Sequence, residues 1–258
     1  MIGIAKDYGK GALRVLLAGL LMTGPGVDAI AAGDTEVMVR LRAADAKFIG
    51  SGVGGVNVTV QNAATGEVLD SGRITGGTGD TDKLMKHGQR RGYSPAGPDT
   101  AGFEAELDIE HPTRVRVALN GPLAAAQRIP ETSVTTWVIP GEDMTDPGLV
   151  LRLPGLLVDL ADREATQGSV QVTADVAMMC GCPITEDGLW PADDFEVVAR
   201  LMRDGETVAE EELDATGSAS RFAGTLEPSE PGNYRLMIHA VQKDTANVGV
   251  YESGLTLQ

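Results

Sequence analysis

The sequence is poor in aromatic residues, histidine and basic side chains, and each shortage narrows its function. Phe, Trp and Tyr together make up 4% of the 258 residues, and there are three histidines. Lys and Arg number 21 against 37 Asp and Glu, so the formal net charge is −16. A nucleic-acid groove needs clustered basic residues to displace phosphate counterions, and anionic lipid attracts the same residues. We therefore expect neither a nucleic-acid partner nor electrostatic attachment to a membrane.

Catalytic motifs are also missing from the sequence. His87, His111 and His239 are scattered, whereas a catalytic zinc needs three protein ligands at an open site. The sequence contains no His-Glu-x-x-His, no Gly-x-Ser-x-Gly and no phosphate-binding glycine loop in front of a helix. No enzyme class is indicated, and we expect a non-catalytic protein.

The first 31 residues have the order of a secretory signal. Basic residues within 6–14 precede an apolar run at 15–22, and Ala29-Ile30-Ala31 supplies the small residues that a signal peptidase reads. The apolar run is far shorter than the roughly 20 residues that a membrane-spanning helix needs. We expect cleavage after Ala31, a bacterial periplasmic or secreted protein, and no stable membrane span after cleavage.

Alternation of polar and apolar residues recurs through the rest of the chain. It is clearest at 36–42, 56–61, 103–109, 113–119, 169–176, 195–203 and 234–241. Alternation with a period of two buries one face of a strand, as in antiparallel sheets. Thr65-Gly66 and Asp204-Gly205 separate such runs and predict hairpin turns. The sequence predicts an all-β fold of two antiparallel β-sandwiches in tandem.

The alternation is lost in two places. Residues 74–100 are polar, glycine-rich and locally basic, and they predict a long surface loop. Residues 162–168 are polar without a strand pattern, and they predict the boundary between two domains. The expected organisation is a signal peptide at 1–31, an N-terminal sandwich at 32–165 and a C-terminal immunoglobulin-like sandwich at 168–258.

Two segments resemble known β-sandwich families. Pro231–Ala240, with Tyr234 just after a Pro-Gly turn, resembles the late strand of bacterial immunoglobulin-like modules. This resemblance implies that Tyr234 packs at a sandwich corner. The hairpin Val56–Arg73 is similar to one in transthyretin-like or carboxypeptidase-regulatory-like sandwiches. Both resemblances imply a fold, and neither implies an activity.

Both cysteines lie in one sulfur-rich stretch, Met178-Met179-Cys180-Gly181-Cys182. If the preceding strand continues, Met178, Cys180 and Cys182 share one face, while Met179 takes the other. Thiolate and thioether ligands select Cu(I) over hard ions. These four residues are therefore the candidate metal ligands, with Met179 joining only if the strand breaks. Trp190 follows in an acidic loop and is expected to anchor a sandwich edge.

Two other fates are open to the cysteines. Two cysteines of an exported protein normally pair, although extended residues two apart have Cα atoms about 6.6 Å apart, near the upper limit for a disulfide. Unpaired, inert thiols are the third alternative. A thiol-disulfide enzyme ranks last, because no helix N-terminus lies nearby to lower the thiol pKa.

Two functions therefore compete. The first is an exported soft-metal-binding or accessory protein, with Cu(I) as the expected ion and another exported protein as the expected partner. The second is a structural or protein-interaction module with a Cys180–Cys182 disulfide and no metal.

Overall fold

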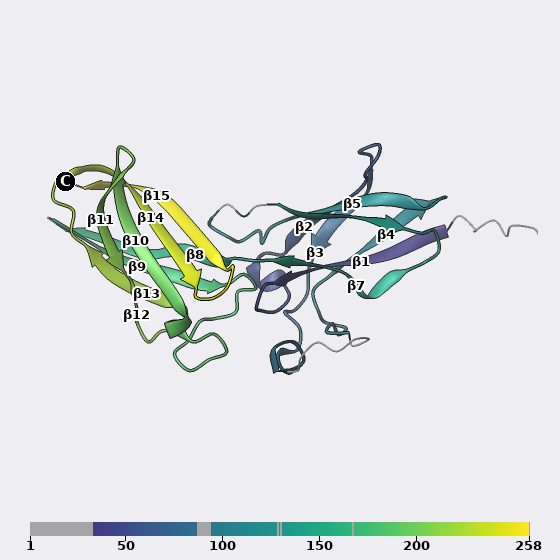
Figure 1. Cartoon of the computed structure of the whole chain (residues 1–258), viewed down its shortest axis with the longest axis horizontal. Helices are drawn as coiled ribbons and strands as arrows, with labels where there is room; N and C mark the ends of the chain where they lie inside the picture. The colour runs from purple at the N-terminus through teal and green to yellow at the C-terminus, as the bar shows by residue number, and fades with distance from the viewer. Residues whose placement is uncertain (1–32, 87–93, 128, 130, 167, 258) are drawn as a thin grey trace, which may run out of the picture. The chain divides into compact units, whose positions relative to one another are not determined.

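β-Strands dominate the described chain, as the alternation predicted (Figure 1). The structure is a computed structural model, and it describes residues 33–86, 94–127, 129, 131–166 and 168–257. The expected signal peptide at 1–31 lies outside the described residues, so export stays a prediction. No helix within the described residues has the length and apolar character that crossing a membrane requires.

The first half of the described chain forms two sheets. Its strands are β1 (Gly33–Ala43), β2 (Val56–Asn62), β3 (Val68–Ile74), β4 (Phe103–Ile109), β5 (Thr113–Asn120), β6 (Thr132–Val138) and β7 (Met144–Leu153). They pair in the orders β4-β1-β7 and β3-β2-β5-β6. Alternate residues of β1, β2 and β5 are buried, which places the core between the sheets.

The second half forms two further sheets. Its strands are β8 (Leu156–Thr166), β9 (Ser169–Met178), β10 (Phe195–Arg203), β11 (Glu206–Glu212), β12 (Asp214–Ala215), β13 (Arg221–Leu226), β14 (Gly232–Gln242) and β15 (Val248–Leu257). They pair in the orders β12-β13-β9-β8 and β11-β10-β14-β15. The expected all-β sandwich fold is confirmed, and residues Ala31–Gln258 form one compact unit.

The expectation of purely antiparallel sheets is wrong at one position. β7 lies parallel to β1, with Val39 opposite Leu149 and Leu41 opposite Leu151. The direction of β7 is not imposed by a hairpin, because the preceding strand, β6, belongs to the other sheet. A strand that enters from another sheet can pair in either direction.

Residues 162–166, expected to lack a strand, belong to β8. β8 runs through Thr166 and pairs with β9 from Leu156 to the hairpin turn. The register shifts between Leu160 and Asp162, and residues 161–166 are exposed on both faces, so their side chains need not alternate. The sheets change over near Pro154-Gly155 instead. Independent folding of the second half stays a prediction, and a fragment starting at 168 lacks β8.

The expected long loop at 74–100 is tied to the first half. Thr75 and Gly77 form isolated bridges to Gly102 and Thr100. A helical turn at Asp82–Lys86 follows, of which residue 84 is buried. Residues 87–93 lie outside the described part of the chain.

The Arg40 guanidinium on β1 binds the end of this loop, where the chain leads into β4. It donates hydrogen bonds to the carbonyl oxygens of Thr100, Ala101 and Pro147. Burial lowers the pKa of Arg40 because the cation is removed from water. These hydrogen bonds fix residues 100–101, at the end of the loop, beside β1.

Tyr234 occupies the corner position that the resemblance implied. Its ring is buried, and its hydroxyl donates a hydrogen bond to the carbonyl of Glu230, four residues upstream. The Arg203 guanidinium lies 4.4 Å from the ring centroid and donates to the same hydroxyl. This is the geometry of a tyrosine corner, in which the hydroxyl joins the start of β14 to the segment before it.

His239 gives the second half a predicted acid sensitivity. It lies on β14 between Val198 and Val250. Burial lowers the pKa of His239, and Arg200 lowers it further, while Glu196 and Glu210 oppose the shift. A lowered pKa in the folded state means that the unfolded chain binds more protons below about pH 6.5, so stability is complete above that pH and falls as the pH drops.

We expect His239→Gln to flatten the loss of stability between about pH 7 and pH 5, because glutamine does not titrate there. Urea unfolding of both proteins at a series of pH values measures this, with pH 8 as the reference at which His239 is neutral. If the stability of the two proteins fell equally with pH, protonation of His239 would not be the cause of the loss.

Candidate functional site

The sulfur-rich stretch forms a tight turn at the end of β9. The N–H of Gly181 donates to the carbonyl of Met178 at 2.7 Å, and the N–H of Met178 donates to the carbonyl of Cys182 at 3.1 Å. Gly181 has a φ of 75°, a left-handed conformation that glycine adopts without strain from a Cβ. The chain therefore reverses direction directly after β9.

This turn pairs the two cysteines. Cys180 and Cys182 form a disulfide, with their Cα atoms 5.4 Å apart, closer than an extended strand allows. The assumption of a continuing strand is wrong, so Met178, Cys180 and Cys182 are not three ligands on one strand face. A disulfide offers no thiolate, and thiolates are the stronger of the predicted Cu(I) donors. In the described part of the chain, no group of three His, Cys, Asp or Glu residues is arranged to hold a metal.

The sulfur atoms belong to a packed interior. Met178, Met179, Cys180 and Cys182 are each at most 5% exposed. Met178 ends the inward-facing row of β9, and a Cβ added at Gly155 would lie 2.6 Å from Met179 Cε. The four sulfur-bearing side chains are therefore buried, whereas Gly181 between the cysteines is exposed, and the two methionines pack as core residues.

Val53 of the first half lies against this turn. A Cβ added at Gly181 would lie 2.7 Å from Val53 Cγ1, so a larger side chain at 181 would displace Val53. Val53 belongs to a short 3₁₀ turn, Ser51–Val53, that precedes β2. The disulfide turn thus lies where residues of the two halves meet.

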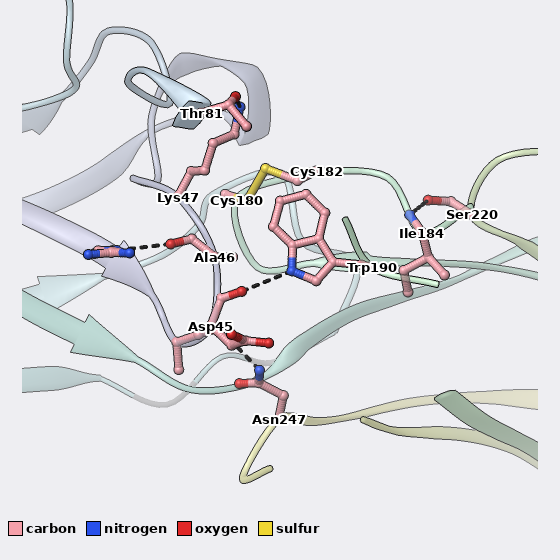
Figure 2. Close-up of a disulfide and its surroundings, with 12 residues drawn as sticks. Asp45, Ala46, Lys47, Thr81, Cys180, Cys182, Ile184, Trp190, Ser220 and Asn247 are labelled. Atoms are coloured by element: carbon pink, nitrogen blue, oxygen red, sulfur yellow. Dashed lines mark hydrogen bonds between the residues drawn. A yellow bond between two sulfur atoms is a disulfide. The ribbon is translucent and has the colours of Figure 1, made fainter. Parts of the chain in front are cut away.

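Trp190 and Asp45 form one hydrogen-bonded link at this place (Figure 2). The indole N–H of Trp190 donates to the carbonyl of Asp45 at 2.9 Å, and the Trp190 ring is 5% exposed beside the disulfide. Asp45 has a φ of 53° in the turn after β1, and its carboxylate accepts a hydrogen bond from Gln242 at 2.8 Å. Trp190 was expected to anchor a sandwich edge; it is buried, and its hydrogen-bond partner lies in the first half.

Asn247 forms the second link. Its amide NH₂ donates to the carbonyl of Ala44 at 3.1 Å and to Oε1 of Gln242 at 2.7 Å. Its Oδ1 accepts the N–H of Gly155 at 2.9 Å. Asn247 is 1% exposed, so every polar atom of its side chain needs these partners.

Arg42 supports the turn that presents Asp45. Its Nε donates to the carbonyl of Ala46 at 2.9 Å and its Nη2 to the carbonyl of Leu84 at 3.1 Å. Burial lowers the pKa of Arg42, the nearby Arg152 lowers it further, and Asp45 raises it. The turn is thus held from inside the first half before it meets the second.

Sequence reasoning identified the sulfur residues and Trp190 but missed Asp45, Gln242 and Asn247. Asp45 and Trp190 are 145 residues apart, and Ala44 and Asn247 are 203 apart. Polar residues in short turns are common on protein surfaces, and the local sequence carries no sign that Gln242 and Asn247 are buried. We name the set Asp45, Cys180, Cys182, Trp190 and Asn247 the junction cluster.

Comparisons with known proteins do not assign the chain to a family. No protein-family model and no curated protein matches the chain. Among solved structures, a DUF3823 family protein from Bacteroides ovatus is 11% identical, with a TM-score of 0.32 over 86% of this chain and 100% of that one. The titin domains Z1Z2 in complex with telethonin are 11% identical, with a TM-score of 0.23 over 87% and 95% of the two chains. Likenesses at these TM-scores carry no argument about function.

Proposed function

We propose that the chain is an exported structural and protein-interaction module, in which the Cys180–Cys182 disulfide braces the junction cluster. The observation that carries this proposal is the position of the disulfide. It joins two buried cysteines in a turn that lies against Val53 and beside Trp190, where the two halves meet. A disulfide in this position stabilises the turn that meets the first half.

The brace acts locally rather than through the unfolded chain. A disulfide that closes a loop of only three residues removes little entropy from the unfolded state. Its effect is to hold Met178 to Cys182 in one turn, and so to keep the surface that meets Val53 in place. With this turn fixed, the two halves keep their contact while other surfaces of the module bind a partner protein.

Location and partner are part of the same proposal. The order of residues 1–31 supports export to the periplasm or the outside, where disulfides persist. The acidic composition supports a partner other than nucleic acid. A protein at this location meets other exported proteins, so we propose one of these as its partner.

The thiol count of the protein without its first 31 residues tests the brace. We expect no free thiol before reduction and two after it. We expect the double variant Cys180→Ser/Cys182→Ser to unfold at a lower temperature, by about 2–4 °C for each kcal/mol lost. The control is Ser253→Ala, which changes a similar side chain on β15 away from the turn. Two free thiols before reduction, or an unchanged melting temperature in the double variant, would contradict the brace.

Copper binding in the reduced state is the second candidate function. The observation that favours it is the collection of Met178, Met179, Cys180 and Cys182 in one turn. Reduction restores two thiolates beside two thioethers, which is a donor set that Cu(I) prefers.

Competition against a Cu(I) chelator separates the two functions. We expect the oxidised protein to bind no Cu(I), because the disulfide leaves no thiolate and the two thioethers are weaker donors. One Cu(I) per reduced chain, lost in both Cys180→Ser and Cys182→Ser, would establish the copper site. Met178→Ala should weaken such a site less, since a thioether is neutral, and Met237→Ala on β14 is the matched control. Equal affinity of the reduced wild type and the double cysteine variant would end the copper function.

A further inference from the structure

The outer face of the sheet β3-β2-β5-β6 combines an exposed aromatic ring with cations. Alternate residues of β2, β5 and β6 point away from the core, because their neighbours Val58, Val60, Val115, Val117 and Val138 are buried. Six outward residues make up what we call the arginine–tryptophan face: Thr59, Gln61, Arg114, Arg116, Thr135 and Trp137. Figure 1 shows β2, β3 and β5 of this sheet.

The pairing register brings these residues next to one another. Arg114 is directly opposite Trp137, and Arg116 is opposite both Thr135 and Gln61. Directly opposed residues on neighbouring strands have Cβ atoms about 5 Å apart. The cations, the ring and the neutral hydrogen-bonding groups therefore form one continuous patch.

Trp137 is the most exposed of the large hydrophobic residues in the described chain. It is 59% exposed, whereas the other tryptophan, Trp190, is 5% exposed. The residue opposite it is Arg114, and the next outward positions, Arg116 and Thr135, are also polar. Ile139, two residues after Trp137, is 37% exposed, so the apolar surface near the ring is small compared with the centre of a protein–protein interface. A flat, isolated ring among hydrogen-bonding groups suits a ligand that has both an apolar face and hydroxyl groups.

The charge of the face is opposite to that of the chain. Arg116 is paired with Glu131, while the Arg114 guanidinium has no hydrogen-bond or ion-pair partner among the described residues. The net charge of −16 acts weakly here, because at physiological ionic strength charges more than about 8 Å away are largely screened. The face therefore selects an anion locally, and guanidinium groups recognise carboxylates by paired N–H donors.

We propose that the arginine–tryptophan face binds an acidic polysaccharide built from uronic acid units. Each unit carries an apolar C–H face for Trp137, hydroxyls for Thr59, Gln61 and Thr135, and a carboxylate for Arg114. An acidic protein segment would supply carboxylates without repeated hydroxyls. The inference does not depend on the disulfide brace, since no residue of the junction cluster belongs to the face.

The experiment measures binding of polygalacturonate to the protein without its first 31 residues. Retardation in native gels and the change in tryptophan emission both report binding, and the buried Trp190 leaves the emission change to Trp137. We expect Trp137→Ala to weaken binding by roughly tenfold, from the usual strength of an aromatic contact. We expect Arg114→Gln to weaken it by a similar factor and rising salt to weaken it in the wild type.

Controls separate this face from a general attraction. Val208→Ala, on the acidic edge strand β11, and Arg235→Gln, on the other half, should leave binding unchanged. Dextran, a neutral polymer, and polyglutamate, an acidic peptide, should bind at least tenfold more weakly than polygalacturonate. Equal binding of polyglutamate, equal binding by Trp137→Ala, or no binding by the wild type would each overturn the proposal.

Discussion

Trp190→Ala is expected to lower the free energy of unfolding by about 3–5 kcal/mol, the usual range for removing a buried aromatic side chain. The ring is 5% exposed, and its N–H bonds the carbonyl of Asp45. Alanine would leave a cavity beside the disulfide and would remove the hydrogen-bond donor of the Asp45 carbonyl. Urea unfolding, followed by circular dichroism, measures the change.

Two variants divide this effect into its parts. Trp190→Phe keeps most of the ring volume but loses the N–H, so we expect a loss of about 1–2 kcal/mol. Trp137→Ala removes the same side chain type from an exposed position and should stay within about 0.5 kcal/mol of the wild type. If Trp190→Ala were as stable as Trp137→Ala, the packing of Trp190 at the junction would be refuted.

Asn247→Ala should cost about 2–4 kcal/mol, because its side chain satisfies three groups in a buried site. Alanine leaves the Gly155 N–H, the Ala44 carbonyl and Oε1 of Gln242 each without a partner, and an unsatisfied buried polar group costs about 1–3 kcal/mol. Partial relaxation of these groups keeps the total below the simple sum. The same urea unfolding experiment applies.

A near-isosteric change shows which atoms of Asn247 matter. Asn247→Asp keeps an oxygen for the Gly155 N–H but replaces both amide donors with a buried negative charge, so it should cost at least as much as alanine. Asn233→Ala is the matched control: its Oδ1 accepts one hydrogen bond from Thr256 at an exposed position, and we expect about 0.5 kcal/mol or less. A full loss in the control, or none in Asn247→Ala, would show that the junction hydrogen bonds contribute little.

The disulfide and the two polar links have distinct roles. Cys180–Cys182 sets the shape of the turn, whereas Trp190 and Asn247 connect other loops of the second half to the turn after β1. Loss of the disulfide should therefore be milder than loss of Trp190. The arginine–tryptophan face lies on the outer side of the β3-β2-β5-β6 sheet, so changes to either feature test separate parts of the protein.

Much of the strand content was predictable from the sequence alone. The period of two that marks 56–61 and 169–176 is local, since each residue's face depends only on its position in the strand. The burial of Val56, Val58 and Val60 follows from it directly. The corner position of Tyr234 was implied by the resemblance to bacterial immunoglobulin-like modules, whose motif is local, since the hydroxyl bonds a carbonyl only four residues away.

Only the tertiary structure decided the features that depend on distant residues. The parallel direction of β7 depends on pairing with β1, and the exposed end of β8 depends on pairing with β9. The sequence determined that the sulfur residues lie together, but the turn at Gly181 decided between a strand face and a disulfide. The links from Trp190 and Asn247 to Asp45 and Ala44 join residues more than 140 positions apart. Neither alternation nor spacing encodes such contacts, because they arise only when packing removes these polar groups from water and each must find a partner.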